Sequence, residues 1–228
     1  ESVGASDAGI YVGQTNIAKI RNSRAAYNVF GFEIENVQDG EYSGNLAECN
    51  TGGFLVYDLD GLTQYGSRSR VFNNVARNNN TYNFAVPGSI VANVPRGSGL
   101  ITLAYDKIDI YDNVFENNGT AGIILTSYDM LGDPGDRRMD VYSEAVNIFN
   151  NTFTNNGNDL PQRLVDADAA HELTLTIDTT NDVQDGTYKY TQPVEVDMDA
   201  CVSVLVAVKT AFAATGTVNN STIQARVK

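Results

Sequence analysis

The sequence predicts a mainly β protein, in which a parallel β-helix of about five coils over residues 1–159 is followed by a small β-β-α element over residues 160–228. Three features of the 228-residue chain predict this fold. A string of glycine and alternating apolar residues recurs at a fixed spacing. Two columns of asparagines recur in step with it, and no segment before residue 198 shows the apolar period of a helix.

The glycine strings define the length of one coil. They recur about every 22 residues, with one double step, and begin at Gly9, Gly31, Gly53, Gly99 and Gly122. Because residues i and i+2 share a face of a strand, each string points two apolar side chains into the bore and one side chain outward. The expected outward residues are Tyr11, Glu33, Leu55 and Ile124. The double step contains two insertions, from about Asp58 to Arg70 and from Tyr82 to Arg96.

The two polar columns lie at fixed offsets from the glycines. The first contains Ser23, Asn45, Asn74, Asn113 and Asn151, and the second contains Asn28, Asn50, Asn79, Asn118 and Asn156. Asparagine tolerates the left-handed backbone of a tight corner, and its amide can pair with the amides above and below. We therefore expect two asparagine ladders. The three glycosylation sequons, at residues 79–81, 118–120 and 150–152, are then by-products of asparagine-rich corners.

The chain changes character near Asp159. Residues 171–178 and 188–198 alternate strictly between apolar and polar, and the Asp185-Gly186 dipeptide between them predicts a hairpin. Asp199 can cap a helix over residues 200–214, which has one apolar stripe. We expect this element to form a second small domain or a lid over the last coil, whose open end would otherwise expose unpaired backbone.

Motifs within residues 6–159, about two thirds of the chain, resemble bacterial right-handed parallel β-helix repeat proteins. They are residues 6–14 (SDAGIYVGQ), 32–36 (FEIEN), 50–59 (NTGGFLVYDL), 83–85 (NFA) and 119–125 (GTAGIIL). The resemblance implies a right-handed coil and an exported protein, located in the periplasm or secreted. It also implies that several coils precede Ser6, and the start at Glu1 without a leader indicates a processed or excised chain.

Residues 166–228 are loosely similar to the C-terminal half of single-stranded RNA phage coat proteins, in their order of strand, strand and helix. The similarity is carried by the pattern of residues 188–192, 194–196 and 201–212. It implies a virion component that self-associates through residues 166–228. This segment departs from an RNA-binding coat in its charge, because it contains nine acidic and four basic residues.

Composition narrows the classes of function. The chain has 15 Lys and Arg against 28 Asp and Glu, and a net charge of -13 disfavours binding to nucleic acid or to anionic lipid. No apolar run approaches the ~20 residues of a membrane-spanning helix. The single histidine, His171, lies outside the coils, and the chain has neither a nucleophile elbow nor a phosphate-binding loop.

The candidate catalytic residues lie in the first insertion and, two repeat units further along the chain, within residues 106–109. A long β-helix offers a linear polysaccharide a groove along one side. Hydrolysis there needs two carboxyls about 5 to 10 Å apart, and chemistry on acidic sugars needs a base and a neutralising charge. The candidates are Asp58, Asp60, Arg70, Asp106, Lys107 and Asp109. The alternative is that these are solvated surface charges.

A second acidic string occupies the loop that interrupts the last coil. Its members are Asp129, Asp133, Asp136 and Asp140. Oxygen-rich loops hold calcium, although the spacing here is not that of an EF-hand. The alternative is a turn at Pro134-Gly135 with charged flanks.

These features favour an extracytoplasmic scaffold that binds or processes acidic polysaccharide along the insertion-bearing face, and they leave open whether the protein is an enzyme. The alternative function is a self-assembling structural protein, such as a virion component, in which the C-terminal element drives oligomerisation. A third interpretation is that the two parts come from different genes.

Overall fold

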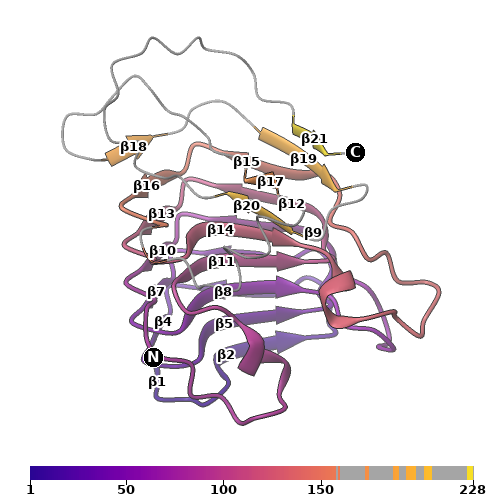
Figure 1. The fold of residues 1–228 in the computed structure, drawn as a ribbon, viewed down its shortest axis with the longest axis horizontal. Helices are drawn as coiled ribbons and strands as arrows, with labels where there is room; N and C mark the ends of the chain where they lie inside the picture. Colours follow the sequence, from indigo (N-terminus) through magenta and orange to yellow (C-terminus); the bar gives the residue numbers. More distant parts are fainter. Residues whose placement is uncertain are drawn as a thin grey trace.

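The computed structural model describes residues 1–157 and 159, together with short strands at residues 173–174, 187–189, 194–198, 203–206 and 225–227. It shows a mainly β protein whose strands form three parallel sheets of a parallel β-helix, as predicted (Figure 1). Within these residues, no helix is both long and apolar enough to cross a membrane.

We call the three sheets A, B and C. Each coil contributes one strand to each sheet, first to sheet B, then to sheet C and then to sheet A. Sheet B contains β2 (Ala8–Gly13), β5 (Phe30–Glu35), β8 (Gly52–Tyr57), β11 (Ser98–Leu103) and β14 (Ala121–Thr126). Sheet C contains β3 (Lys19–Arg21), β6 (Glu41–Ser43), β9 (Ser67–Phe72), β12 (Asp106–Tyr111) and β15 (Val146–Phe149). Sheet A contains β1 (Ser2–Val3), β4 (Arg24–Ala26), β7 (Leu46–Glu48), β10 (Val75–Arg77), β13 (Val114–Glu116) and β16 (Thr152–Thr154).

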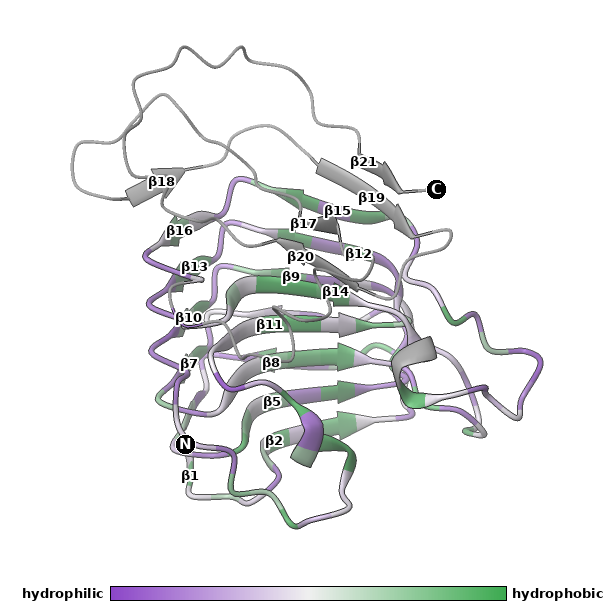
Figure 2. Cartoon of the chain, in the orientation of Figure 1, coloured by the Kyte–Doolittle hydropathy of each residue, from purple (hydrophilic) through white to green (hydrophobic). Residues whose placement is uncertain are grey.

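The glycines lie in one line along the axis, as the repeat predicts. Ile10 pairs in register with Phe32, and Phe32 pairs with Phe54, so that the preceding glycines also stack. The inward side chains of β5 and β8 are buried and those of β2 are partly buried, and the rings of Phe32 and Phe54 stack with centroids 4.7 Å apart. Like side chains therefore lie one over another in the bore. Figure 2 shows hydrophobic residues recurring along the stacked strands.

Both asparagine columns form ladders, which confirms the second feature of the repeat. Asn50 is typical: its Nδ2 donates to Asn79 Oδ1 at 3.1 Å in the next coil and to the Ala25 carbonyl at 3.0 Å. The backbone N–H of Asn50 donates to the same Oδ1 at 3.1 Å. Asn79 and Asn118 are fully buried in this way, so neither side chain can accept a glycan.

The expected location of the left-handed backbone was wrong. The ladder asparagines do not have positive φ; the residue before each ladder position does. These residues are Asn22, Gly44, Asn73, Asp112 and Asn150 in the first column, and Tyr27, Cys49, Asn78, Asn117 and Asn155 in the second. The chain turns one residue early, and the following side chain is thereby directed inward, where its amide pairs with the neighbouring coils.

A second apolar core lies on the outer face of sheet B. Leu55 and Ile124 do point out of the bore, as predicted, but they are buried there together with Ile101. The second insertion covers them and places Val91, from the short 3-10 helix η1 (Ile90–Asn93), among them. The insertion-bearing face is therefore packed against its own loops and does not present an open sheet.

The C-terminal strands continue the three sheets beyond the last coil. Strands β18 (Thr187–Lys189), β19 (Val194–Met198) and β20 (Ser203–Val206) pair antiparallel with β16, β15 and β14. Strands β17 (Leu173–Thr174) and β21 (Ala225–Val227) pair parallel with β20 and β19.

Two predictions for this region were wrong. The strands within residues 171–178 and 188–198 do not pair as a hairpin, because β17, β18 and β19 belong to different sheets; Asp185-Gly186 lies outside the described residues. The helix expected over residues 200–214 is contradicted at residues 203–206, which form β20, and its other residues are outside the described part. The apolar residues of β20 pair with the free edge of β14, which stabilises a strand over a helix.

Candidate functional site

Two loops meet at the corner where the chain passes from sheet B to sheet C. We call this place the loop junction; it consists of residues 58–66 and 127–145. Asp60 connects the loops, because its carboxylate accepts hydrogen bonds from the backbone N–H groups of Gly135 at 2.8 Å and Asp136 at 2.9 Å. Tyr65 Oη donates to Asp136 Oδ2 at 2.8 Å. Loops that are separated by a whole coil in sequence thus form one surface.

Three carboxylates converge at the loop junction. Asp106 begins β12, and Asp140 and Glu144 lie in the loop that leads to β15. One oxygen of each carboxylate lies within 4.8 Å of those of the other two. The backbone holds them there: Glu144 N donates to Asp106 Oδ1 at 3.0 Å, and Lys107 N donates to the Glu144 carbonyl at 2.8 Å. We call Asp106, Asp140 and Glu144 the carboxylate trio.

The trio is a site of concentrated negative charge. Burial, together with the charges of Asp140 and Glu144, raises the pKa of Asp106 to about 6, although the Glu144 N–H and the charge of Lys107 act in the opposite direction. Asp106 is half-buried, whereas Asp140 and Glu144 are exposed. An oxygen-rich, solvent-facing group of this kind suits a hard cation such as calcium.

Asp58 lies behind the trio and closes the first insertion. Only 3% of it is exposed, and both of its carboxylate oxygens accept from the Gly66 N–H at 2.8 Å. Burial, together with the charges of Asp106 and Glu35, raises its pKa to about 7. Because a side chain so deeply buried does not touch a polymer on the surface, its observed contacts are structural.

The remaining predicted catalytic residues lie elsewhere. Arg70 and Asp109 are neighbours in register on the outer face of sheet C, where Arg70 pairs with Glu41 and Asp109 accepts from Asn147 Nδ2 at 3.0 Å. The structure therefore places Asp58 and Asp60 in the loop junction, Asp106 and Lys107 beside it, and Arg70 and Asp109 on a different face.

The predicted calcium ligands are also separated. Asp136 is occupied by Arg138 and Tyr65, and the hydrogen bonds from Arg138 hold the pKa of its carboxyl well below the usual range. Asp133 lies 3.9 Å from Arg137. Asp140 alone joins the trio, and the side chain of Asp129 is outside the described part. Sequence reasoning missed Glu144, although it continues the acidic string of this loop at a similar spacing.

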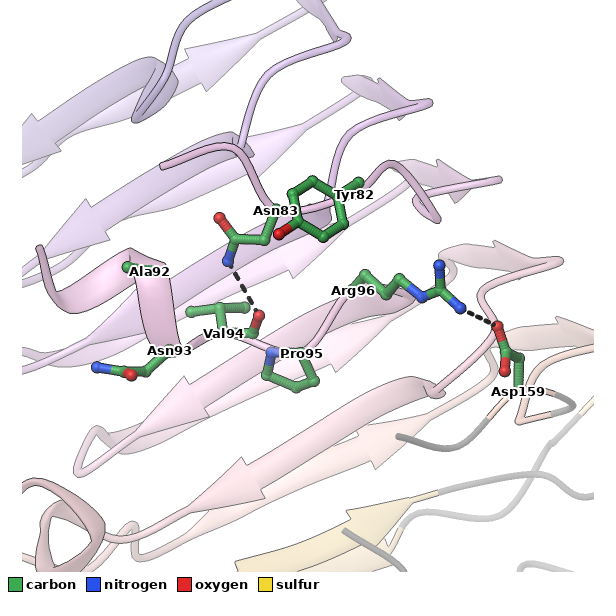
Figure 3. A pocket seen from close by; sticks show the side chains of 8 residues that line it. All are labelled: Tyr82, Asn83, Ala92, Asn93, Val94, Pro95, Arg96 and Asp159. Atoms are coloured by element: carbon green, nitrogen blue, oxygen red, sulfur yellow. Dashed lines mark hydrogen bonds and ion pairs between the residues drawn. The ribbon is translucent and has the colours of Figure 1, made fainter. Parts of the chain in front are cut away.

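A cavity of about 370 Å³ lies at the second insertion (Figure 3). Its lining includes Tyr82, whose exposed fraction is 78%, and Arg96, which pairs with Asp159 at 2.8 Å. Asn83 fixes the loop by donating from Nδ2 to the Val91 carbonyl at 2.8 Å and to the Val94 carbonyl at 3.1 Å. The volume is at the lower end of that of small-ligand sites.

Comparisons with protein-family models, with curated proteins and with solved structures find no match to this chain.

Proposed function

We propose that this protein is a β-helix scaffold, of the type found in exported bacterial right-handed β-helix repeat proteins, that binds acidic polysaccharide through calcium at the loop junction. The observation that carries the proposal is the carboxylate trio, in which one oxygen from each of the three residues lies within 4.8 Å of the other two, and in which Asp140 and Glu144 are exposed. The polysaccharide would lie across the insertion-bearing side of the coils.

The charge of the molecule makes a bridging cation necessary. A chain with a net charge of -13 repels a polyanion, so direct contact is unfavourable. Calcium takes about 6 to 8 oxygen ligands, and three carboxylates supply at most about six. Asp106 Oδ1 and Asp140 Oδ1 already accept backbone N–H groups. A bound calcium therefore keeps positions for water and for carboxylates of the polymer.

The cavity at the second insertion offers a second contact for the same polymer. Tyr82 provides an exposed aromatic ring, and Arg96 provides a guanidinium whose partner Asp159 is itself exposed. Exposed ion pairs are weak, so a ligand carboxylate can replace Asp159 on Arg96. Binding is better supported than cleavage, because Asp58 is buried and Arg70 faces another side.

Removing a carboxylate from the trio is expected to weaken calcium binding. Asp140→Asn and Glu144→Gln should each lower calcium affinity by about tenfold or more in titration calorimetry, because each removes a charged ligand. The matched control is Asp133→Asn, in the same loop but outside the trio, which should bind as the wild type does. The immobilised protein should retain acidic polysaccharides in the presence of calcium and release them when a chelator is added. Absence of calcium binding by the wild-type protein, or retention that ignores chelator, would contradict the proposal.

A second candidate function is assembly into a larger particle. Strands β1, β2 and β3 lie at one edge of their sheets, and Val3 and Ile17 of the first coil are exposed. Open sheet edges pair readily with other strands. The described C-terminal strands pair with the last coil, whereas β1, β2 and β3 can still pair with a strand of another molecule or of a preceding segment of the same chain. Light scattering that shows a monomer at all concentrations would exclude this function.

A further inference from the structure

A cluster of acids and tyrosines lies on the outer face of sheet B at the first three coils. Tyr57 Oη is 3.2 Å from Glu33 Oε2 and 3.2 Å from Glu35 Oε2. Tyr11 Oη donates to Glu35 Oε1 at 2.9 Å. Glu33 lies in register between Tyr11 and Leu55, and only 3% of it is exposed. The loop junction and the cavity do not include these residues.

Counting protons shows that this cluster is one proton short if both glutamates are ionised. The Tyr57 hydroxyl has a single proton for two carboxylate oxygens. Glu33 Oε1 is buried and receives no hydrogen bond from the described residues. Asp7, from the segment before β2, is the group that a protonated Glu33 would hydrogen-bond. Buried carboxylates without donors are strongly unfavourable, so the geometry requires a neutralising group.

We propose that Glu33 carries a proton at neutral pH and donates it to the Asp7 carboxylate, so that the first coil is held to the second by a pH-sensitive contact. The chain of hydrogen bonds then runs from Glu33 to Asp7 on one side. On the other side, Tyr57 donates to the glutamate oxygens and Tyr11 donates to Glu35. Deprotonation of Glu33 places two carboxylates against each other and loosens the segment that carries Asp7.

A proton fits this cluster better than a metal ion does. Among the described residues, the trio brings three carboxylate oxygens within 4.8 Å of one another. The acids around Glu33 do not form such a group. The charged groups that act on Glu33 are Asp7 and Glu35, both acidic, and the neighbouring hydroxyls are those of Tyr57 and Tyr11. Glu33 is therefore neutralised by a proton on its own carboxyl group and not by a neighbouring positive charge.

The electrostatics agree in direction. Burial, and then the charge of Asp7, raise the pKa of Glu33 to about 8 from 4.5. Because the folded protein keeps a proton that the unfolded chain releases, this group stabilises the fold fully below about pH 4.5. Its contribution falls as the pH rises to about 8 and is lost above that. Each pH unit in this window lowers the folding equilibrium constant by about tenfold.

The test is Glu33→Gln, whose neutral amide can donate to Asp7 and accept from Tyr57 at any pH. The folding equilibrium constant of the wild type, divided by that of the variant, should fall by about tenfold per unit between pH 5 and 8 in urea titrations. The control is Glu48→Gln: Glu48 pairs with Arg24 and Arg77, which lower its pKa, so its stabilisation is present throughout this window. The folding equilibrium constant of the wild type divided by that of Glu48→Gln should not change with pH between 5 and 8.

A measurement on the wild type keeps the proposal falsifiable if the variant does not fold. Carbon-13 NMR of labelled glutamate carboxyls should show one group that titrates near pH 8. Two results would overturn the proposal: all glutamates titrating below about pH 6, or a ratio for Glu33→Gln that is flat with pH. If sodium or calcium stabilises the wild type but not Glu33→Gln, a bound cation and not a proton neutralises Glu33, and the proposal is wrong.

Discussion

Replacing Asn79 with alanine is expected to prevent folding or to lower the free energy of unfolding by about 4 kcal/mol or more, because four buried groups each lose one hydrogen bond. Asn79 Oδ1 accepts from the N–H and the Nδ2 of Asn50, both at 3.1 Å. Its Nδ2 donates to the Ala47 carbonyl at 3.2 Å and to Asn118 Oδ1 at 3.1 Å. Water does not reach these groups, since Asn50 and Asn118 are fully buried.

The adjacent asparagine provides the control for this experiment. Asn80 is exposed, donates to the Asn117 carbonyl at 2.7 Å and accepts from the Gly119 N–H at 2.7 Å. Water can replace these contacts, so Asn80→Ala should cost no more than about 1 kcal/mol. Urea denaturation followed by circular dichroism measures both variants. Equal losses would show that the ladder does not hold the coils together.

Replacing Gly53 with alanine is expected to destabilise the protein by about 3 kcal/mol, the upper part of the usual range for overpacking. A Cβ atom at this position would lie 2.3 Å from the Gly99 carbonyl oxygen in the next coil and 3.2 Å from Ala76 Cβ. The clash is with backbone that is fixed by parallel pairing of β8 with β11. The strands must therefore separate, and no side chain can move to relieve the contact.

Gly135→Ala is the matched control for the glycine column. Its Cβ would lie 3.4 Å from Asp60 Oδ2 on an exposed loop, which is an ordinary contact. Its melting temperature should stay close to that of the wild type, whereas that of Gly53→Ala should fall by many degrees. Similar melting temperatures for both variants would show that the glycines are not required by the stacking.

The coil could be predicted because stacked rungs impose the same requirement at equivalent positions. Gly31 and Gly53 are glycines because the neighbouring carbonyl leaves no room for a Cβ, and Asn50 and Asn79 pair through identical amides. Such requirements recur in the sequence with the length of the coil. Positions whose environment changes from coil to coil give no such signal; Tyr105, for example, is buried in the bore and bonds to Ser69 at 2.5 Å.

The candidate site was less predictable, because its residues meet through loops that interrupt the repeat. Asp106 was identified from its coil position and Asp140 from an acidic loop, but their convergence with Glu144 depends on how that loop folds back onto β12. Burial also changes the role of a residue without changing its type. Asp58 was a catalytic candidate in the sequence and is a buried loop contact in the structure.

The C-terminal part shows where periodicity misleads. Val204 and Leu205 fit an apolar helical stripe, yet they lie in β20 and pair with Leu125 and Ile124 of β14. A short apolar run suits either structure, and the partner decides between them. Here the strands of the last coil, β14, β15 and β16, pair with β20, β19 and β18, which the sequence pattern of residues 200–214 does not reveal by itself.

The ladders give the rod a polarity. In the second column, Asn28, Asn50, Asn79 and Asn118 each donate from Nδ2 to the asparagine of the following coil, and the series ends at Asn156, so that the side-chain dipoles add in a single direction. Aligned hydrogen bonds polarise one another. Acceptors therefore face one end of the stack and donors face the other. A coil stacked in the reverse direction would oppose like groups and would not extend the ladder.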